Sequence, residues 1–405
     1  QGQHHRPPPP QGEGLAELHN RCNNMIVFNQ ALLTGGENRN LQRVFASREF
    51  SGTGEFNKLA SGWLEQKIRC RKALLTSSCT SALEIIARLL HLREGDEIIF
   101  PAFTHVGTVD PFVKAGATPV WADIRSDTLN IDEQLLPSLL SERTKAIVAV
   151  HYGGVACHLD YLQNFCRQHE LILIEDAAQS IGAGYKTSSL GSFGNLAALS
   201  FHQTKNIHCG EGGALLINDP AFETEAQLMH DRGTNRADFE QGRVDRYTWQ
   251  ISSSNYLLSE LQAAFLYTQM QSLEKVTQHR SALWSAYYEA LSRVLPADKL
   301  PRISEECRPN GHCFYLLTDS PEQRAALIRY LRDHGVEAVF HYQALHKAPF
   351  WQNAYAATDL PVTERVCDTI LRLPMHYDLT FADISFITKL VEAFYSGDDP
   401  RGLES

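Results

Sequence analysis

The chain has 405 residues, of which 43% are hydrophobic, and it carries a formal net charge of −10 with a pI near 5.9. This length suits two domains with a substantial core. The acidic balance argues against nucleic acid as a partner, because nucleic acids select basic faces. No apolar run approaches the ~20 residues that a membrane span needs, and the first residues lack the apolar middle of a signal peptide. We therefore expect a cytoplasmic protein that binds neither nucleic acid nor a membrane.

The nine cysteines form neither a CxxC pair nor a Cys/His ligand spacing. Their odd number favours free thiols in a reducing compartment, and we expect no metal site. Residues 1–24 include four consecutive prolines and several Gly, Gln and His, which predicts a disordered extension, either native or added. The neighbouring histidines His4 and His5 in this segment give little support to metal binding.

Strand and helix patterns alternate from residue 72 onward. Predicted strands cover 72–75, 97–100, 119–124, 146–150, 171–174 and 196–201, and predicted helices cover 81–92, 106–114 and 161–168. Ser81 with Glu84 resembles a capping box at the start of the first helix. Repeated βα units indicate an α/β fold with a mainly parallel sheet and helices on both faces.

The order of elements changes in the last third of the chain. Residues 256–295 are predicted to be largely helical, followed by a strand at 312–317, a helix at 321–334, a strand at 336–342 and a last helix at 381–395. We expect a large domain over residues 25–265, a smaller C-terminal α/β domain over 266–396, and a tail over 397–405.

An acid and a lysine follow two of the predicted strands. Asp176 and Gln179 come after the apolar run 171–174, and Lys205 comes after the run 196–201. In an open α/β sheet, ligands bind at the carboxyl ends of the strands. A pyridoxal phosphate (PLP) enzyme needs this pair, an amine to bond the cofactor and a carboxylate to keep the ring nitrogen protonated. Alone, Asp176 suits a helix cap and Lys205 a solvated surface position.

A turn of hydroxyl residues supplies the third feature. Residues 76–81 read Thr-Ser-Ser-Cys-Thr-Ser between a strand and a helix, where free backbone N–H groups suit a phosphate. Simple N-capping is the better explanation of such a turn when it stands alone, so the turn counts only in combination with the other features. Gly182 and Gly184 lack the third glycine of a dinucleotide fingerprint, and no P-loop motif occurs. The glycines of residues 210–213 allow close backbone approach beside Lys205.

Together these motifs resemble the sugar-nucleotide aminotransferases of the DegT/DnrJ/EryC1/StrS family, from about residue 26 to residue 395. The motifs that carry the resemblance are Thr-Ser-Ser-Cys-Thr-Ser-Ala-Leu at 76–83, Pro-Ala-Phe-Thr at 101–104, Asp123, His-Tyr-Gly-Gly at 151–154, Glu-Asp-Ala-Ala-Gln at 175–179, Ser-Phe-His-Gln-Thr-Lys at 200–205 and Gly-Glu-Gly-Gly at 210–213. The resemblance implies fold type I of the PLP-dependent aminotransferases.

The resemblance also implies roles for individual residues. Lys205 is expected to be the Schiff-base lysine and Asp176 the partner of the pyridinium nitrogen. The other expected cofactor contacts are Ser78, Cys79, Thr80 and Ser200 at the phosphate, Gln179 near the phenolic oxygen, His105 over the ring, and Asn255 reaching the phosphate from a neighbouring subunit. A homodimer with shared active sites follows. His312 and His341 are expected near the sugar nucleotide, with a structural role as the alternative for each.

The implied reaction moves an amino group from L-glutamate to the 4-keto group of a dTDP-sugar, dTDP-4-dehydro-6-deoxy-D-glucose. The product is dTDP-4-amino-4,6-dideoxy-D-galactose, used for cell-surface polysaccharides. A 3-keto sugar nucleotide or the other C4 epimer remains an alternative, as does a non-catalytic PLP-binding regulator. A PLP dehydratase of this fold is expected to carry histidine where this chain has Lys205.

Overall fold

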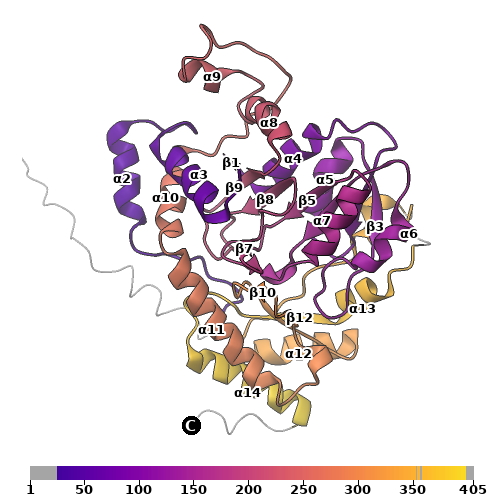
Figure 1. Cartoon of the computed structure of the whole chain (residues 1–405). Helices are drawn as coiled ribbons and strands as arrows, with labels where there is room; N and C mark the ends of the chain where they lie inside the picture. Colours follow the sequence, from indigo (N-terminus) through magenta and orange to yellow (C-terminus); the bar gives the residue numbers. More distant parts are fainter. Residues whose placement is uncertain (1–24, 353, 356–357, 398–405) are drawn as a thin grey trace, which may run out of the picture.

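A computed structural model describes residues 25–352, 354–355 and 358–397 of the chain. The predictions for residues 1–24, with His4 and His5, and for the tail beyond Gly397 lie outside the described residues. A large mixed sheet with helices on both faces forms the upper part in Figure 1, and a small two-stranded sheet covered by helices forms the lower part. The expected α/β fold class is confirmed.

The large sheet has seven strands in the order β1-β9-β8-β5-β4-β2-β3. Only β9 runs antiparallel to its neighbours, so the carboxyl ends of the other six strands lie at one edge. Its strands are β1 (Lys72–Thr76), β2 (Glu97–Pro101), β3 (Thr118–Ala122), β4 (Thr144–Val150), β5 (Ile172–Asp176), β8 (Leu196–Ser200) and β9 (Gly213–Ile217). A separate sheet joins β6 (Gly184–Tyr185), β7 (Ser188–Ser189) and β10 (Cys307–Arg308).

Alternate residues of the central strands face opposite layers of helices, as strand geometry requires. Ile174 packs in the same core as helices α4 (Cys79–Leu89) and α5 (Val106–Lys114). Leu173 lies on the other face, in the core that α7 (Leu159–Gln168) covers. The helices α2 (Glu37–Ser47), α3 (Glu55–Ile68) and α10 (Glu260–Met270) complete that second face with α6 (Leu136–Leu139). Neighbouring residues of one strand therefore meet different surroundings.

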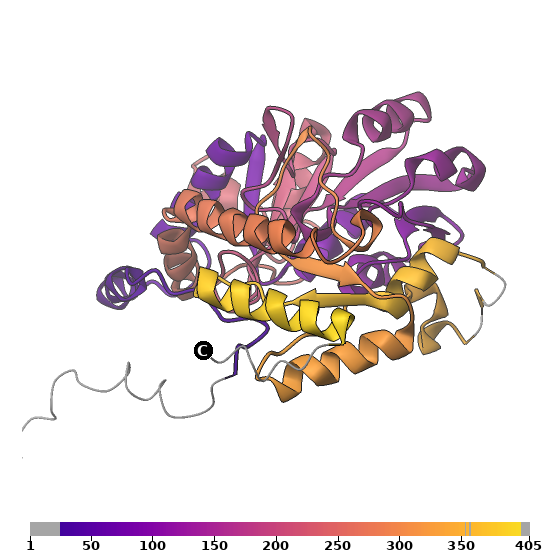
Figure 2. The same ribbon diagram turned by 90° about the horizontal axis from the view of Figure 1, so that it is seen from below.

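The second core lies in the last third of the chain. It joins β11 (Phe314–Leu317) and β12 (Ile370–Leu373) to α11 (Leu273–Leu291), α12 (Pro321–Asp333) and α14 (Phe381–Ser396). Figure 2 shows α14 between α11 and α12. The remaining helices are α8 (Glu223–His230), α9 (Arg236–Glu240) and α13 (Pro361–Thr369). Figure 1 shows α9 and its flanking loops projecting beyond the rest of the large sheet's helices.

Most predicted elements are present, and two are wrong in detail. The helix at 106–114 is confirmed at both ends, and the capping box of Thr380 and Asp383 is present. The predicted strand at 336–342 is wrong, because Val336 and Val339 form only isolated bridges and β12 takes the place beside β11. The helix predicted from residue 81 begins at Cys79, and its N-cap is Ser78, so the Ser81–Glu84 capping box is also wrong.

Two further sequence expectations meet the structure. The eight cysteines in the described part of the chain are free thiols, as predicted; Cys22 lies outside it. Among the described helices, none combines the length and the apolar character that crossing a bilayer requires.

Candidate active site

A cavity of about 580 Å³ opens at the carboxyl-end edge of the large sheet and extends to the two-stranded sheet. Such an edge is the usual ligand site in an open α/β sheet. The predicted site residues that line it are Ser78, Cys79, Thr80, His105, Asp176, Gln179, Ser200, Lys205, His312 and His341. The structure thus brings together ten of the eleven predicted residues, and Asn255 is the exception.

The N-terminus of α4 forms one end of the cavity. Ser78 caps the helix, and its Oγ accepts a hydrogen bond from the Ser81 amide at 3.0 Å. The amides of Cys79 and Thr80 have no partner within the helix, and the helix dipole favours an anion at this end. A side chain at Gly213 would collide with the backbone of Ser78 and Cys79, so this glycine permits the close approach of β9.

Asp176, the last residue of β5, is the buried acid of the cavity and is only 5% exposed. Its Oδ2 accepts a hydrogen bond from Thr108 Oγ1 at 2.7 Å, and its Oδ1 accepts one from the Ala178 amide at 3.1 Å. Thr108 in turn lies 2.8 Å from the hydroxyl of Thr104. Sequence reasoning missed Thr108, whose only signal is its place one turn into the helix that follows β2. These two donors orient the carboxylate and leave lone pairs for a ligand.

Lys205 follows β8 and is half-buried in the cavity wall. Burial chiefly lowers the pKa of its amine, while the charge of Asp176 opposes that shift. A less basic amine is a better nucleophile at neutral pH. The Cys79 thiol is itself kept protonated, because burial raises its pKa well above the ordinary value. Lys205 is therefore the group of this wall best suited to act as a nucleophile, and Cys79 is a neutral neighbour.

His105 lies at the mouth of the cavity as the N-cap of α5. Its Nδ1 accepts a hydrogen bond from the Gly107 amide at 3.0 Å, which places the ring proton on Nε2. Desolvation, with the nearby Lys205 charge, lowers the pKa of this imidazole. A neutral ring stacks against an aromatic ligand without adding positive charge beside Lys205.

Both the oxygen and the nitrogen of the Gln179 side-chain amide form hydrogen bonds within the cavity wall. Its Oε1 accepts a hydrogen bond from the Gly153 amide at 2.6 Å, and its Nε2 donates to the Tyr342 hydroxyl at 3.1 Å. One N–H of the amide remains for a ligand. Tyr342 also lines the cavity and was not among the predicted site residues.

Two histidines line the side of the cavity formed by the smaller core. His312 donates from Nδ1 to Asn206 Oδ1 at 3.0 Å, and the Asn206 amide is oriented by its own bond to the Asn310 carbonyl. Desolvation, with the charge of Lys205, lowers the pKa of His312 well below its usual range. His341 is exposed, and desolvation together with Arg372 lowers its pKa to about 4. Both imidazoles are neutral hydrogen-bonding groups.

Arg372 also lines this side, and sequence reasoning missed it. The available signal was an arginine within the apolar run of residues 370–375. A charge in the middle of a short apolar strand is rare unless it has a partner or a ligand.

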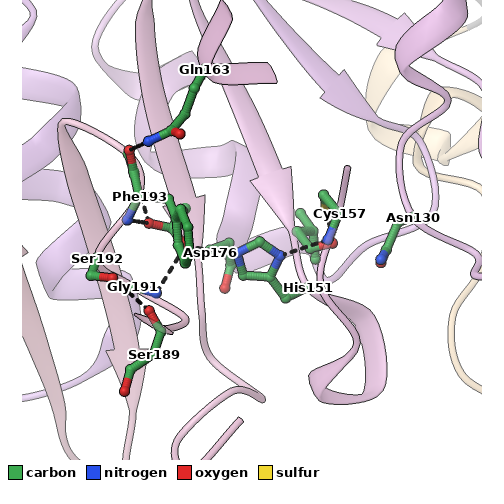
Figure 3. A network of polar contacts seen from close by, with 12 residues as sticks. Asn130, His151, Cys157, Gln163, Asp176, Ser189, Gly191, Ser192 and Phe193 are labelled. Atoms are coloured by element: carbon green, nitrogen blue, oxygen red, sulfur yellow. Dashed lines mark hydrogen bonds and ion pairs between the residues drawn. The ribbon is translucent and has the colours of Figure 1, made fainter. Parts of the chain in front are cut away.

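A buried hydrogen-bonded pair of a histidine and a glutamate lies behind Asp176. Glu175 and His151 are fully buried, with His151 Nε2 2.9 Å from Glu175 Oε2. The His151 ring accepts from the Cys157 amide through Nδ1, so Nε2 donates to the carboxylate. Figure 3 shows His151 between Cys157 and the loop that carries Gly191 and Phe193. This network fixes the end of β4 against the end of β5, because the His151 amide also donates to the Asp176 carbonyl.

Asn255 does not line the cavity. It is exposed, pairs with Asp231 by a backbone bridge, and its Oδ1 accepts from the Leu257 amide at 3.4 Å. No contact with the cavity of the same chain supports it as a cofactor ligand, and the predicted contribution to a neighbouring subunit stays a prediction.

The residues present fit pyridoxal phosphate. The phosphate suits the α4 N-terminus with the hydroxyls of Ser78 and Thr80, because that end offers free amides and positive potential. The ring nitrogen suits Asp176, whose carboxylate is oriented by two donors, and the aldehyde suits the amine of Lys205. Among the residues that the structure describes, no group of three or more His, Cys, Asp or Glu could hold a metal ion.

The chain resembles known proteins over most of its length. It is 28% identical over 363 residues to the spore coat polysaccharide biosynthesis protein SpsC of Bacillus subtilis, covering 84% of this chain and 93% of that protein. DesV of S. venezuelae, solved with a ketimine intermediate, is 27% identical with a TM-score of 0.81, over 90% of this chain and 95% of DesV.

Spr1654 of Streptococcus pneumoniae shares the fold, with 23% identity and a TM-score of 0.84 over 91% of this chain and 99% of Spr1654. Spr1654 has been solved in PMP and PLP forms, in agreement with the cofactor that this cavity fits. The model of the DegT/DnrJ/EryC1/StrS aminotransferase family matches residues 33–392. The chain is an aminotransferase and belongs to the DegT/DnrJ/EryC1/StrS family.

Proposed function

We propose that the chain transfers the amino group of L-glutamate to the 4-keto group of dTDP-4-dehydro-6-deoxy-D-glucose, giving dTDP-4-amino-4,6-dideoxy-D-galactose. The observation that carries the reaction type is the meeting of Lys205, Asp176 and the α4 N-terminus in one cavity of an aminotransferase. The sugar nucleotide rests on the sequence motifs, and the name of SpsC, a polysaccharide biosynthesis protein, supports a role in cell-surface polysaccharides.

The protein residues divide the work between binding and proton transfer. Bound PLP supplies an aldehyde that exchanges amines and a ring that withdraws electrons from the reacting carbon. Asp176 holds a proton at the ring nitrogen, and its bonds from Thr108 and Ala178 keep it aimed there. The Lys205 amine removes the α-proton of the donor and returns a proton on the cofactor side, a task for which its lowered pKa suits it.

The product assay tests this proposal. The holoenzyme is incubated with L-glutamate and each candidate keto sugar nucleotide, and the stereochemistry of the amino sugar is read by NMR. We expect the 4-amino galactose product; a 3-amino sugar or the other C4 epimer would select an alternative within the family. No product from any keto sugar, with no glutamate-dependent shift of the cofactor spectrum, would favour a non-catalytic regulator.

Lys205→Ala is the matched test of the lysine. We expect the visible absorbance of the lysine-bound cofactor to vanish, with at least a ~10⁴-fold loss of turnover, because both the covalent link and the proton transfer are removed. Lys275→Ala, at an exposed position of α11, is the control and is expected to keep both. Retained absorbance in Lys205→Ala would reject the assignment.

We further propose that the protein is a homodimer whose active sites share residues. The projecting segment, which consists of α9 and its flanking loops, exposes large apolar side chains. Trp249 is 77% exposed, Tyr247 55% and Phe239 45%. Exposed aromatic groups gathered on one projection favour a protein partner. Asn255 then reaches the cavity of the second copy.

Mixing two defective variants tests this sharing. Lys205→Ala and Asn255→Ala homodimers are each expected to be impaired, one in chemistry and one in phosphate binding. A mixed dimer has one intact site, with Lys205 from one chain and Asn255 from the other. Co-expression should therefore restore up to half of the wild-type activity per mixed dimer, measured on affinity-separated heterodimers. Mixed dimers no more active than the better parent would contradict shared sites.

A further inference from the structure

Arg372 is a buried cation that faces the cavity. It is 7% exposed and lies in the middle of β12. Its neighbours Leu371 and Leu373 pack in the smaller core, so strand alternation turns Arg372 to the opposite face. That face lines the cavity together with Lys205 and Asp176.

The guanidinium of Arg372 lacks the partners that a buried arginine normally has. Its Nη1 meets His341 Nδ1 at 3.4 Å, the Cys313 thiol is a further side-chain partner, and its Cζ lies 5.2 Å from the centre of the Phe28 ring. Its Nε has no hydrogen-bond partner. Within residues 25–352, 354–355 and 358–397, no carboxylate forms an ion pair with it. Burying a charged group without a counter-charge costs several kcal/mol of folding free energy.

A second buried arginine shows that the fold can satisfy such a group. Arg280 is 3% exposed and donates to the backbone carbonyls of Gly311, His312 and Met375 at 2.8–3.1 Å. These bonds explain Arg280 as a structural residue. Arg372 has no comparable set, although the two lie close enough that both lower the pKa of His312, after desolvation and Lys205. The open donors of Arg372 therefore point to a ligand.

The charge of Arg372 indicates the sign of that ligand. Two cations, Lys205 and Arg372, line the cavity with the buried acid Asp176. A second acid, Glu211, also lines it but is exposed and lies 3.5 Å from His202. The two facing histidines are neutral and supply no negative charge. An anion that binds beside Lys205 would pair with this guanidinium.

The reaction offers three anions, and their chemistry separates them. The cofactor phosphate suits the α4 N-terminus. The diphosphate of a sugar nucleotide is separated from the reacting carbon by the sugar ring. The α-carboxylate of the amino donor is bonded directly to the carbon that carries the reacting amine, and a carboxylate matches the planar fork of a guanidinium.

We infer that Arg372 binds the α-carboxylate of the amino donor and orients the α-carbon toward Lys205. This inference rests on the proposed transamination and adds the donor subsite. Two other arginines, Arg232 and Arg236, do not line the cavity and instead pair with Asp231.

The test is the donor half-reaction of the holoenzyme, followed as the shift of the cofactor spectrum to the pyridoxamine form. Arg372→Gln is expected to lower kcat/KM for L-glutamate roughly a hundredfold, mostly through KM, as expected for loss of a buried charge-assisted pair. Arg329→Gln, at an exposed position of α12, is the matched control and should change neither constant.

Two donors with one carboxylate each locate the contact. L-2-Aminobutanoate keeps the α-carboxylate and should lose as much as L-glutamate in Arg372→Gln. 4-Aminobutanoate lacks it and should be a poor donor for both proteins, with less than a threefold difference between them. A large loss with 4-aminobutanoate alone would overturn the inference, because Arg372 would then bind the distal carboxylate.

Calorimetric titration with dTDP distinguishes the other anion. Equal affinity of wild type and Arg372→Gln for dTDP supports the inference; weaker dTDP binding with an unchanged glutamate half-reaction overturns it. If Arg372→Gln does not fold, Arg372→Lys keeps the charge without the fork, and an unchanged KM for L-glutamate in that variant overturns the inference. A wild-type protein that shows no half-reaction at all refutes the proposed function instead, and dTDP binding then still reports on Arg372.

Discussion

Glu175 and Asp176 are adjacent carboxylates on one strand, and the fold uses them in opposite ways. Glu175 shares the sheet face of Leu173, where it is fully buried and accepts four hydrogen bonds, three from the amides of Gly191, Phe193 and Gly194 and one from His151. Asp176 faces the α4 and α5 side and accepts two. Glu175 has its acceptor capacity filled and organises the structure, whereas Asp176 keeps lone pairs free for a ligand.

The difference follows from strand geometry. Successive side chains of β5 point to opposite faces of the sheet. Glu175 therefore meets the amides of a loop, and the next residue, Asp176, lines the cavity. The loop that Glu175 holds leads directly into β8, which ends at Ser200 and is followed by Lys205. Glu175 thus stabilises the loop and strand that position Lys205, while Asp176 lies within the cavity.

Asp176→Asn should give the largest effect and leave the frame intact. We expect turnover to fall about 10³-fold, equivalent to ~4 kcal/mol, because an amide does not hold a proton at the ring nitrogen. The free energy of unfolding of the cofactor-free protein should change by no more than about 1 kcal/mol, since the substitution affects only two accepted hydrogen bonds. Steady-state kinetics and urea titration measure the two quantities.

Asp298→Asn, at an exposed position, controls for loss of one charge and should change neither measurement. Asp176→Glu keeps the charge and is expected to recover part of the turnover. An Asp176→Asn protein that is largely unfolded, with normal turnover in its folded fraction, would contradict the assignment of Asp176 to chemistry and of Glu175 to structure.

The part of the site that follows single strands was predictable from the sequence. Asp176, Lys205 and the turn at Ser78 each come directly after an apolar strand, so local pattern and the parallel order of the sheet placed them together. The helix from Val106 was predicted at both ends, because its cap and its apolar spacing are local features.

The opposite wall was not predictable in the same way. The direction of Arg372 depends on the pairing of β12 with β11, and the pattern instead suggested a strand at 336–342. Its contact with Phe28 joins distant parts of the chain, which residue spacing does not reveal. The same holds for Glu175, which was visible in the motif, while its partners on the loop of Gly191 were not.

Glu175→Gln should show the converse of Asp176→Asn, with a smaller total effect. An amide nitrogen replaces one carboxylate oxygen and meets N–H donors, so a buried pair is broken and a donor is left facing donors. We expect a loss of ~3 kcal/mol in the free energy of unfolding at pH 7 and a turnover of the folded enzyme within about tenfold of wild type. Glu142→Gln, at an exposed position, is the matched control.

The pH dependence sharpens this prediction. Against the cost of its burial, the bonds from His151 and the amides hold the pKa of Glu175 below its ordinary value of 4.5. A carboxyl whose pKa is lowered by folding stabilises the protein fully above its unfolded pKa, and that stabilisation is lost as the pH falls through the folded pKa. The difference between wild type and Glu175→Gln should therefore be constant from pH 7 to about 5.5 and shrink below about pH 4.5, in urea titrations at each pH. A difference that instead grew on acidification would mean that Glu175 is protonated in the folded protein and that the comparison with Asp176 is mistaken.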